Sequence, residues 1–136
     1  MEIVVSDFQN SSAAAQVRAL IGAHTQAQDA GRTEEIVDLY TVDGVLDVPG
    51  FGQITGRDAL RAAFEGWVPT TPQRHLVANT LITVDSDDEA TASSDVAFFQ
   101  RGESGWAVKV LGKYEDTLRL QDGRWRFAKR ATTYQA

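Results

Sequence analysis

The chain has 136 residues, 43% of them hydrophobic and 24% charged, a composition typical of a soluble globular protein, and we expect a single domain over residues 1–136. Its formal net charge of −6 disfavours binding to phosphate backbones, so nucleic acid is not an expected partner. The absence of cysteine and the presence of two histidines exclude disulfides, thiolate zinc sites and three-histidine zinc sites. We therefore expect neither a metal nor a cofactor.

The hydropathy of the sequence bears on its location in the cell. No apolar stretch approaches the ~20 residues that a membrane span needs. The first residues, MEIVV, lack the basic region and the long apolar core of a secretion signal. We expect a cytoplasmic protein that does not contact a membrane.

Helical periodicity predicts three helices in the first half of the chain. The first is expected to be capped by Ser11 or Ser12 and to end near Gly31. Its inner stripe would consist of Val17, Ile21, His24 and Gln28. Thr33 is expected to cap the second helix, whose inner face would consist of Ile36, Leu39 and Tyr40. The third would run from about Arg57 to Trp67.

Strand patterns occupy the rest of the sequence. Two short extended pieces are predicted at residues 45–48 and 53–55, separated by a turn that contains proline and glycine. After Pro72 the period of the apolar residues changes from 3.6 to 2. This change predicts four longer strands, at residues 73–84, 89–101, 106–120 and 124–134. Helices followed by an antiparallel meander indicate an α+β fold.

Strict alternation along these strands assigns side chains to faces of the sheet. One face of the strand 73–84 would carry His75, Val77, Asn79 and Leu81. Another set alternates with apolar residues and is expected on an outward or interfacial face: Arg124, Arg126 and Arg130. In the strand 106–120 apolar residues fall on both faces, with Val108, Val110, Leu118 and Leu120 opposite Ala107 and Leu111. Because a lone sheet would expose one of these faces, we expect a homodimer.

Three polar residues are candidates for chemistry. His24 lies on the inner stripe of the first helix, and His75 begins a strand. Asp29 closes the first helix, where the helix dipole disfavours a carboxylate, so a specific partner is expected. A carboxylate beside a histidine is the minimum apparatus for general acid and base catalysis. Each residue also has a structural alternative. His24 would be a hydrogen-bonded core histidine, His75 a histidine at the rim of the pocket, and Asp29 an ordinary residue at a helix end.

Five segments together resemble the nuclear transport factor 2-like superfamily, in particular its SnoaL-like branch. They are HTQAQDAGR at 24–32, LYTVDGV at 39–45, RHLVAN at 74–79, GKYED at 112–116 and DGRWRF at 122–127. The resemblance extends over nearly the whole chain. It implies a strongly curved antiparallel sheet, wrapped by about three helices into a cone-shaped barrel with an apolar internal pocket. It also implies a homodimer through the outer face of the sheet.

The superfamily includes scytalone dehydratase, ketosteroid isomerase, polyketide cyclases, small subunits of dioxygenases and non-catalytic binders. The resemblance to the dehydratase places its helix-one aspartate at Asp29 and one of its two catalytic histidines at His75. The region of Phe98 and Phe99 replaces the second histidine, and the two water-holding tyrosines fall at Gln28 and Val48. His24 stands where the isomerase has its oxyanion-holding tyrosine.

The resemblance therefore implies a cofactor-independent lyase or isomerase, of the dehydratase or polyketide-cyclase type, acting on a hydrophobic oxygenated small molecule. His75 would transfer the proton and Asp29 would orient it. The polar residues expected to hold the substrate are His24, Tyr114 and Asn79. The apolar wall would consist of Val17, Ile21, Val48, Trp67, Val77 and Phe99. The alternative is a non-catalytic binding or scaffold protein of the same fold.

Overall fold

A computed structural model describes the backbone of residues 2–135 and the side chains of residues 10–135. The helices in this range are α1 (Glu2–Ala30), α2 (Thr33–Asp38) and α3 (Arg57–Gly66). The strands are β1 (Tyr40–Val48), β2 (Gly52–Thr55), β3 (Gln73–Val84), β4 (Glu89–Gly102), β5 (Gly105–Gln121) and β6 (Arg124–Gln135). The α+β class and the order of elements agree with the sequence-based prediction.

The starts of the first two helices differ from the prediction. α1 begins at Glu2 and continues through Ser11 and Ser12. Ser12 Oγ accepts a hydrogen bond from the side-chain amide of Gln16, one turn further along. This serine therefore lies within the helix and does not cap it. Thr33 is already helical in α2, and no side chain caps that helix. Its first turn still carries two acidic residues, as the helix dipole favours.

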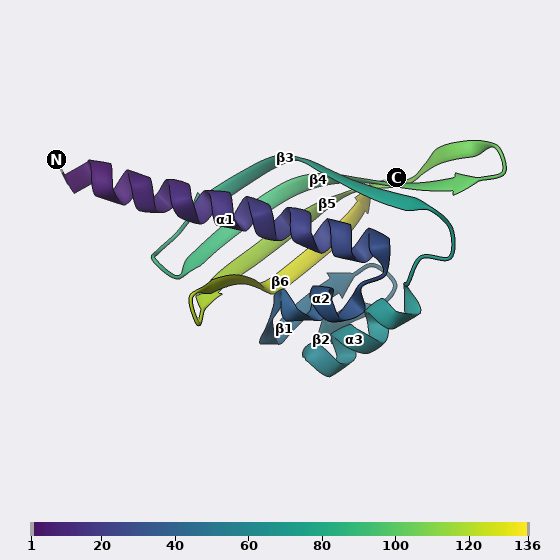
Figure 1. Ribbon diagram of the computed structural model, residues 1–136, viewed down its shortest axis with the longest axis horizontal. Coiled ribbons are helices and arrows are strands. Elements are labelled where there is room, and N and C mark those ends of the chain that lie inside the picture. Colours follow the sequence, from purple (N-terminus) through teal and green to yellow (C-terminus); the bar gives the residue numbers. More distant parts are fainter. Residues whose placement is uncertain (1, 136) are drawn as a thin grey trace.

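The strands form one curved sheet in the order β2-β1-β6-β5-β4-β3 (Figure 1). β3 to β6 pair antiparallel as a meander, whereas β1 pairs parallel with β6. The sheet ends at β2 and β3, which do not pair with each other, so it is open and not a closed barrel. In Figure 1, α1 crosses the face formed by β3 to β6, and α2 and α3 lie at the end that carries β1 and β2.

The hydrophobic core lies between the helices and the inner face of this sheet. Its large buried side chains come mainly from α1, α2, α3, β1, β5 and β6, and they include Val17, Ile36, Val37, Tyr40, Leu60, Phe64, Leu118 and Phe127. No helix within residues 2–135 combines the length and the apolar character needed to cross a membrane.

The pairing of β3 with β4 is interrupted at Asn79, and this overturns one predicted face. The register shifts between Ala78 and Leu81, and Asn79 adopts a positive φ of 55°. An irregularity of this kind moves the side chains that follow it to the opposite face. Leu81 is consequently 73% exposed, while Ile82 packs against the core. Asn79 itself is exposed and donates to Asp95, so the prediction that it shares a face of the sheet with His75 is wrong.

A second irregularity changes the face of Arg130. Thr117 pairs with Lys129 but Leu118 pairs with Phe127, which leaves Ala128 as an extra residue in β6. Arg130 therefore shares the inner face with Phe127 and is 1% exposed, against the prediction of an outward face. Arg124 and Arg126 precede the extra residue, and both form ion pairs with Asp38.

A third irregularity lies in β5. Phe98 pairs with Val110 and Phe99 with Val108, so Lys109 is the extra residue. Val108 is exposed, whereas Val110 faces inward. The prediction that Val108 and Val110 share a face is therefore wrong.

Candidate functional site

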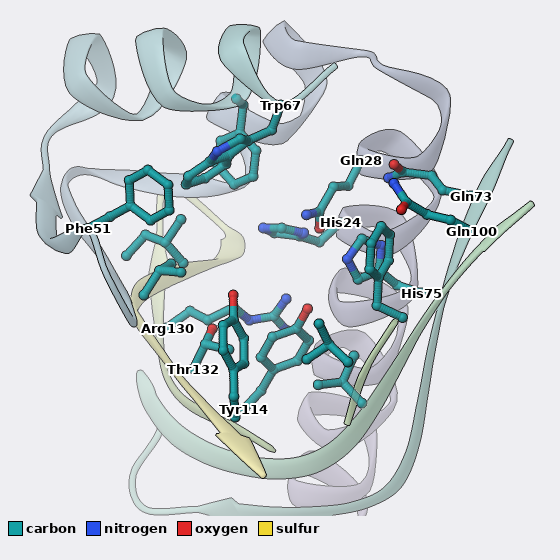
Figure 2. Close-up of a pocket in the computed structure, with 17 residues that line it drawn as sticks. His24, Gln28, Phe51, Trp67, Gln73, His75, Gln100, Tyr114, Arg130 and Thr132 are labelled. Carbon is teal, nitrogen blue, oxygen red and sulfur yellow. The ribbon is translucent and has the colours of Figure 1, made fainter. Parts of the chain in front are cut away.

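A cavity of about 330 Å³ lies between the helices and the inner face of the sheet (Figure 2). One wall is a row of three directly paired residues, His75 on β3, Phe98 on β4 and Val110 on β5. Figure 2 shows Phe51 and Trp67 on the side of the cavity opposite this row. The remaining lining is formed by His24, Gln28, Leu46, Val48, Phe64, Gln73, Val96, Gln100, Tyr114, Arg130, Thr132 and Tyr134.

Asp29, at the end of α1, binds the first residues of β3. Its Oδ1 lies 2.6 Å from His75 Nδ1 and accepts a bond of 3.1 Å from the side-chain amide of Gln73. Its Oδ2 accepts a bond of 2.7 Å from the backbone N–H of His75. Because an ionised carboxylate only accepts hydrogen bonds, Nδ1 carries a hydrogen and Nε2 is left as the basic nitrogen of the neutral ring. The partner expected for Asp29 is therefore His75, with Gln73 beside it.

The surroundings of this pair hold Asp29 in its charged form. Burial by itself would raise the pKa of Asp29, but the hydrogen bonds from the His75 ring, the His75 backbone and Gln73 outweigh it. The resulting pKa lies below the ordinary value for an aspartate. The His75 ring also packs on Phe98, with 4.5 Å between ring centroids, so its orientation is fixed from two sides. The arrangement can receive a proton at Nε2 and stabilise the imidazolium that results.

His24 is fully buried beside the hydroxyl of Tyr40. Its Nε2 lies 2.9 Å from the hydroxyl of Tyr40, and its ring packs edge-on against Phe64 and Phe127. Burial, followed by the positive charge of Arg130, lowers the pKa of His24 well below the ordinary value. His24 is therefore neutral at physiological pH. It both belongs to the core and lines the cavity, so the two readings of this residue are combined in one side chain.

Arg130 and Asp116 form a buried ion pair that the sequence analysis did not identify. They are direct cross-strand partners on β6 and β5, with Nε to Oδ1 at 2.8 Å and Nη2 to Oδ2 at 3.1 Å. The guanidinium lies 3.8 Å from the ring centroid of Tyr114 and 4.6 Å from that of Phe127. The sequence contains one indication of this pair. Asp116 is a carboxylate that alternates with the inward-facing Tyr114 and Leu118 along the same strand.

The residues predicted for the site fall into three groups. Those that line the cavity are His24, Val48, Trp67, His75 and Tyr114. Val17 instead lies in the solid core, and Phe99 points away because it alternates with Phe98. Ile21, Val77 and Asn79 line a separate hollow of about 730 Å³ between α1 and β3, which also borders Asp29 and His75. Besides Val48 and Trp67, the apolar wall of the cavity includes six residues that were not predicted for it: Leu46, Phe51, Phe64, Val96, Phe98 and Val110.

In the described part of the chain, no three side chains of His, Asp and Glu gather closely enough to hold a metal ion.

A search of curated protein sequences found no match. Comparison with solved structures found many similar folds.

Among the similar structures are two that share more than 25% sequence identity with this chain. Rv3472, a protein of unknown function from Mycobacterium tuberculosis, is 29% identical, with 88% of this chain and 70% of that chain covered and a TM-score of 0.82. A proposed scytalone dehydratase from Novosphingobium aromaticivorans is 26% identical, with 96% of this chain and 89% of that chain covered and a TM-score of 0.85.

A third similar structure indicates the fold. It is an NTF2-like protein with a cystatin-like fold from Novosphingobium aromaticivorans, 21% identical, with 98% of this chain and 86% of that chain covered and a TM-score of 0.85. Among protein families, the model described as the SnoaL-like domain matches residues 9–131. The chain therefore belongs to the SnoaL-like domain family and has the curved-sheet fold of NTF2-like proteins.

Proposed function

We propose that the protein is a cofactor-independent lyase or isomerase acting on a hydrophobic, oxygenated small molecule, with dehydration as the favoured reaction. The observation that carries this proposal is the 2.6 Å contact between His75 Nδ1 and Asp29 Oδ1 at the wall of a largely apolar cavity. The 26% identity to a proposed scytalone dehydratase, over 96% of this chain, supports the same reaction class.

The proposed dehydration begins with proton transfer to His75. Nε2 removes a proton from the carbon next to a substrate carbonyl, and the electron pair of that C–H bond moves into the carbonyl to give an enolate. When the carbonyl re-forms, the bond to a hydroxyl on the neighbouring carbon breaks. This hydroxyl takes the proton back from His75 and leaves as water, so no proton is gained or lost overall.

Asp29 supports both halves of this reaction without exchanging the proton itself. It holds the ring by Nδ1, and its negative charge stabilises the imidazolium between the two transfers. An isomerisation would use the same first step and return the proton to a different carbon. The pair Asp29 and His75 therefore supports a class of reactions that share an enolate.

The cavity indicates the size and character of the substrate. Its volume of about 330 Å³ lies at the small end of the range for small-molecule sites. Phe51 and Trp67 contact each other edge to face, with centroids 5.1 Å apart, and Phe64 continues this aromatic surface. A compound of one or two rings that carries oxygen substituents fits this combination.

A panel of cyclic β-hydroxy ketones tests the proposal. Dehydration creates a double bond conjugated with the carbonyl, which absorbs in the ultraviolet, so turnover is followed directly. We expect the wild-type protein to convert at least one member. The variants His75→Gln and Asp29→Asn should lower kcat by about 10²- to 10⁴-fold, the contribution of general acid and base catalysis.

Asp95→Asn is the matched control, because Asp95 is also a paired carboxylate but lies on the surface beside Lys113. It should retain full activity. Equal activity in Asp29→Asn and in the wild type would contradict the role of the pair. If the protein binds members of the panel and converts none, the proposal fails and a non-catalytic binding protein is the better description.

A further inference from the structure

Unpaired nitrogen atoms beside the cavity point to a second polar site. Among residues 10–135, three buried side-chain nitrogens lack a hydrogen-bond partner: His24 Nδ1, Arg57 Nε and Arg130 Nη1. Two of these belong to residues that line the cavity, His24 and Arg130. A buried polar group without a partner costs about 1–3 kcal/mol, so such groups in a cavity mark a place where a ligand supplies the partner.

The free edge of Arg130 is held in a fixed position. Nε and Nη2 both bind the Asp116 carboxylate, and the rings of Tyr114 and Phe127 pack against the guanidinium. Since the guanidinium is planar and rigid, these contacts also fix the direction of the N–H bonds on Nη1. Figure 2 shows Arg130 directed into the cavity from β6, toward the region that His24 and His75 enter from α1 and β3.

The hydrogen-bond partners of Tyr40 decide which nitrogen of His24 carries its hydrogen. If the Tyr40 hydroxyl donates to Nε2, its hydrogen is satisfied and the ring hydrogen resides on Nδ1. If Nε2 donates instead, both the hydroxyl hydrogen and the Nδ1 lone pair are left buried without a partner. The first arrangement leaves one buried group without a hydrogen-bond partner and the second leaves two, so the first is favoured. His24 Nδ1 is then an N–H donor, like Arg130 Nη1.

The charges around these donors favour a carbonyl oxygen, or the delocalised single charge of an enolate or phenolate, over a phosphate or sulfate ion. Arg130 is already neutralised by Asp116, and Asp29 adds another negative charge to the same region. His24 contributes no positive charge, because burial and Arg130 lower its pKa. A phosphate or sulfate would lie close to the Asp116 carboxylate, whose charge already neutralises Arg130. A carbonyl oxygen enters without that repulsion, and negative charge that develops on it during reaction meets the guanidinium at close range.

We propose that Arg130 Nη1 and His24 Nδ1 form the subsite that binds the carbonyl oxygen of the substrate and stabilises its enolate. The inference rests on the proposed function and specifies the substrate as a ketone whose α-carbon faces His75 Nε2 while its oxygen faces Arg130. Proton removal by His75 then places the new negative charge on the oxygen held by these two donors. Asp116 is a positioning residue, since it acts through the guanidinium.

Binding of 4-nitrophenol tests the subsite without any turnover. Its phenolate resembles an enolate and absorbs at a longer wavelength than the phenol. At a pH below the solution pKa of the probe, we expect the wild-type protein to bind it as the phenolate, seen as the long-wavelength band. The methyl ether 4-nitroanisole has nearly the same shape but cannot ionise, and it reports whether the apolar cavity is intact.

The main variant replaces both members of the ion pair, Arg130→Met with Asp116→Leu, because removing the arginine by itself would strand a buried carboxylate. This double variant should lose the phenolate band and bind 4-nitrophenol about tenfold or more weakly, with 4-nitroanisole binding unchanged. His24→Phe should reduce the phenolate fraction by a smaller factor. A phenolate band that survives in the double variant overturns the inference, and so does a wild-type protein that binds the probe as the phenol.

Asp29→Asn separates this inference from the proposed function. It should lower turnover of the ketone panel by about 10²- to 10⁴-fold and keep the phenolate band, because Asp29 does not contact the donors of the subsite. If the wild type shows the band but converts no ketone, the reaction assignment fails and the oxygen subsite stands. If it converts ketones and never shows the band, the reaction stands and the subsite is wrong.

Discussion

The two histidines in the cavity have opposite electrostatic surroundings. His75 touches a carboxylate that stabilises its charged form, whereas His24 touches a hydroxyl and lies near the positive charge of Arg130. One ring is therefore arranged to accept a proton and the other to remain neutral. The same residue type can serve as a base and as a hydrogen-bond donor within one small site because the neighbours differ.

The neutral state of His24 predicts how stability depends on pH. The pKa of His24 is lowered in the folded protein, while the unfolded chain keeps the ordinary value of 6.5. Acid therefore adds a proton to the unfolded state first, so stability contributed by this residue is complete above pH 6.5 and is lost as the pH falls below it. At pH 5.5 the loss amounts to about 1.4 kcal/mol.

Urea unfolding of the wild type and His24→Phe at several pH values measures this effect. At pH 7.5 the variant should be the less stable protein, since the hydroxyl of Tyr40 loses its partner. The difference between the two proteins should shrink by about 1.4 kcal/mol on going to pH 5.5. A difference that stays constant over this range would show that His24 is charged in the folded state.

At the scale of elements, the sequence predicts the order of helices and strands well and the faces of the strands poorly. The long strands follow from an apolar period of 2, and all four lie within one or two residues of their predicted ends. The faces fail where a register shift occurs: near Asn79 in β3, at Lys109 in β5 and at Ala128 in β6. An extra residue in one strand reverses every later side chain, and it leaves no mark in the pattern of hydropathy.

These shifts explain which parts of the site were predictable. Asp29 and His75 were identified because one ends a helix against its dipole and the other precedes the first irregularity of β3. Arg130 was assigned to the outer face because strict alternation places it on the same face as Arg126. The extra residue, Ala128, shifts it to the inner face. Phe98 lines the cavity, whereas Phe99 was predicted to do so. Two adjacent phenylalanines cannot be told apart in this respect without the pairing of β4.

Close approach of β5 and β6 depends on Gly112. A Cβ atom at this position would lie 2.4 Å from the backbone oxygen of Thr133 on the neighbouring strand. A backbone atom in a paired strand cannot move aside as a flexible side chain can, so Gly112→Ala should separate the strands and lower the free energy of unfolding by about 1–3 kcal/mol. Thermal unfolding followed by circular dichroism measures the change.

Gly22→Ala is the matched control for this substitution. Gly22 lies within α1, and nothing lies within 4 Å of a Cβ added there. Alanine should therefore stabilise the protein by about 0.5–1 kcal/mol through its higher helix propensity. If both alanine variants shift the unfolding midpoint in the same direction, the strand contact at Gly112 is not the cause of the effect.

At the scale of the whole molecule, the outer face of the sheet carries an apolar patch. One row of direct cross-strand partners there consists of Leu76, Ala97 and Leu111, and the next row brings Phe99 beside Val108. Leu76, Val108 and Leu111 are each more than half exposed. Exposed apolar rows that continue over three strands are typical of a protein interface.

We expect this patch to be covered by a second copy of the chain, giving a homodimer of about 30 kDa from subunits of 14.9 kDa. Each copy would bury one Leu111 in this interface, so Leu111→Lys should place two ammonium groups against an apolar surface at a high cost of desolvation. Sedimentation at micromolar concentration should show a dimer for the wild type and a monomer for this variant. Val42→Lys is the control, because Val42 is 71% exposed on β1, away from the patch, and this variant should stay dimeric. A monomeric wild type, or a Leu111→Lys variant that remains a dimer, would show that the patch is not the interface.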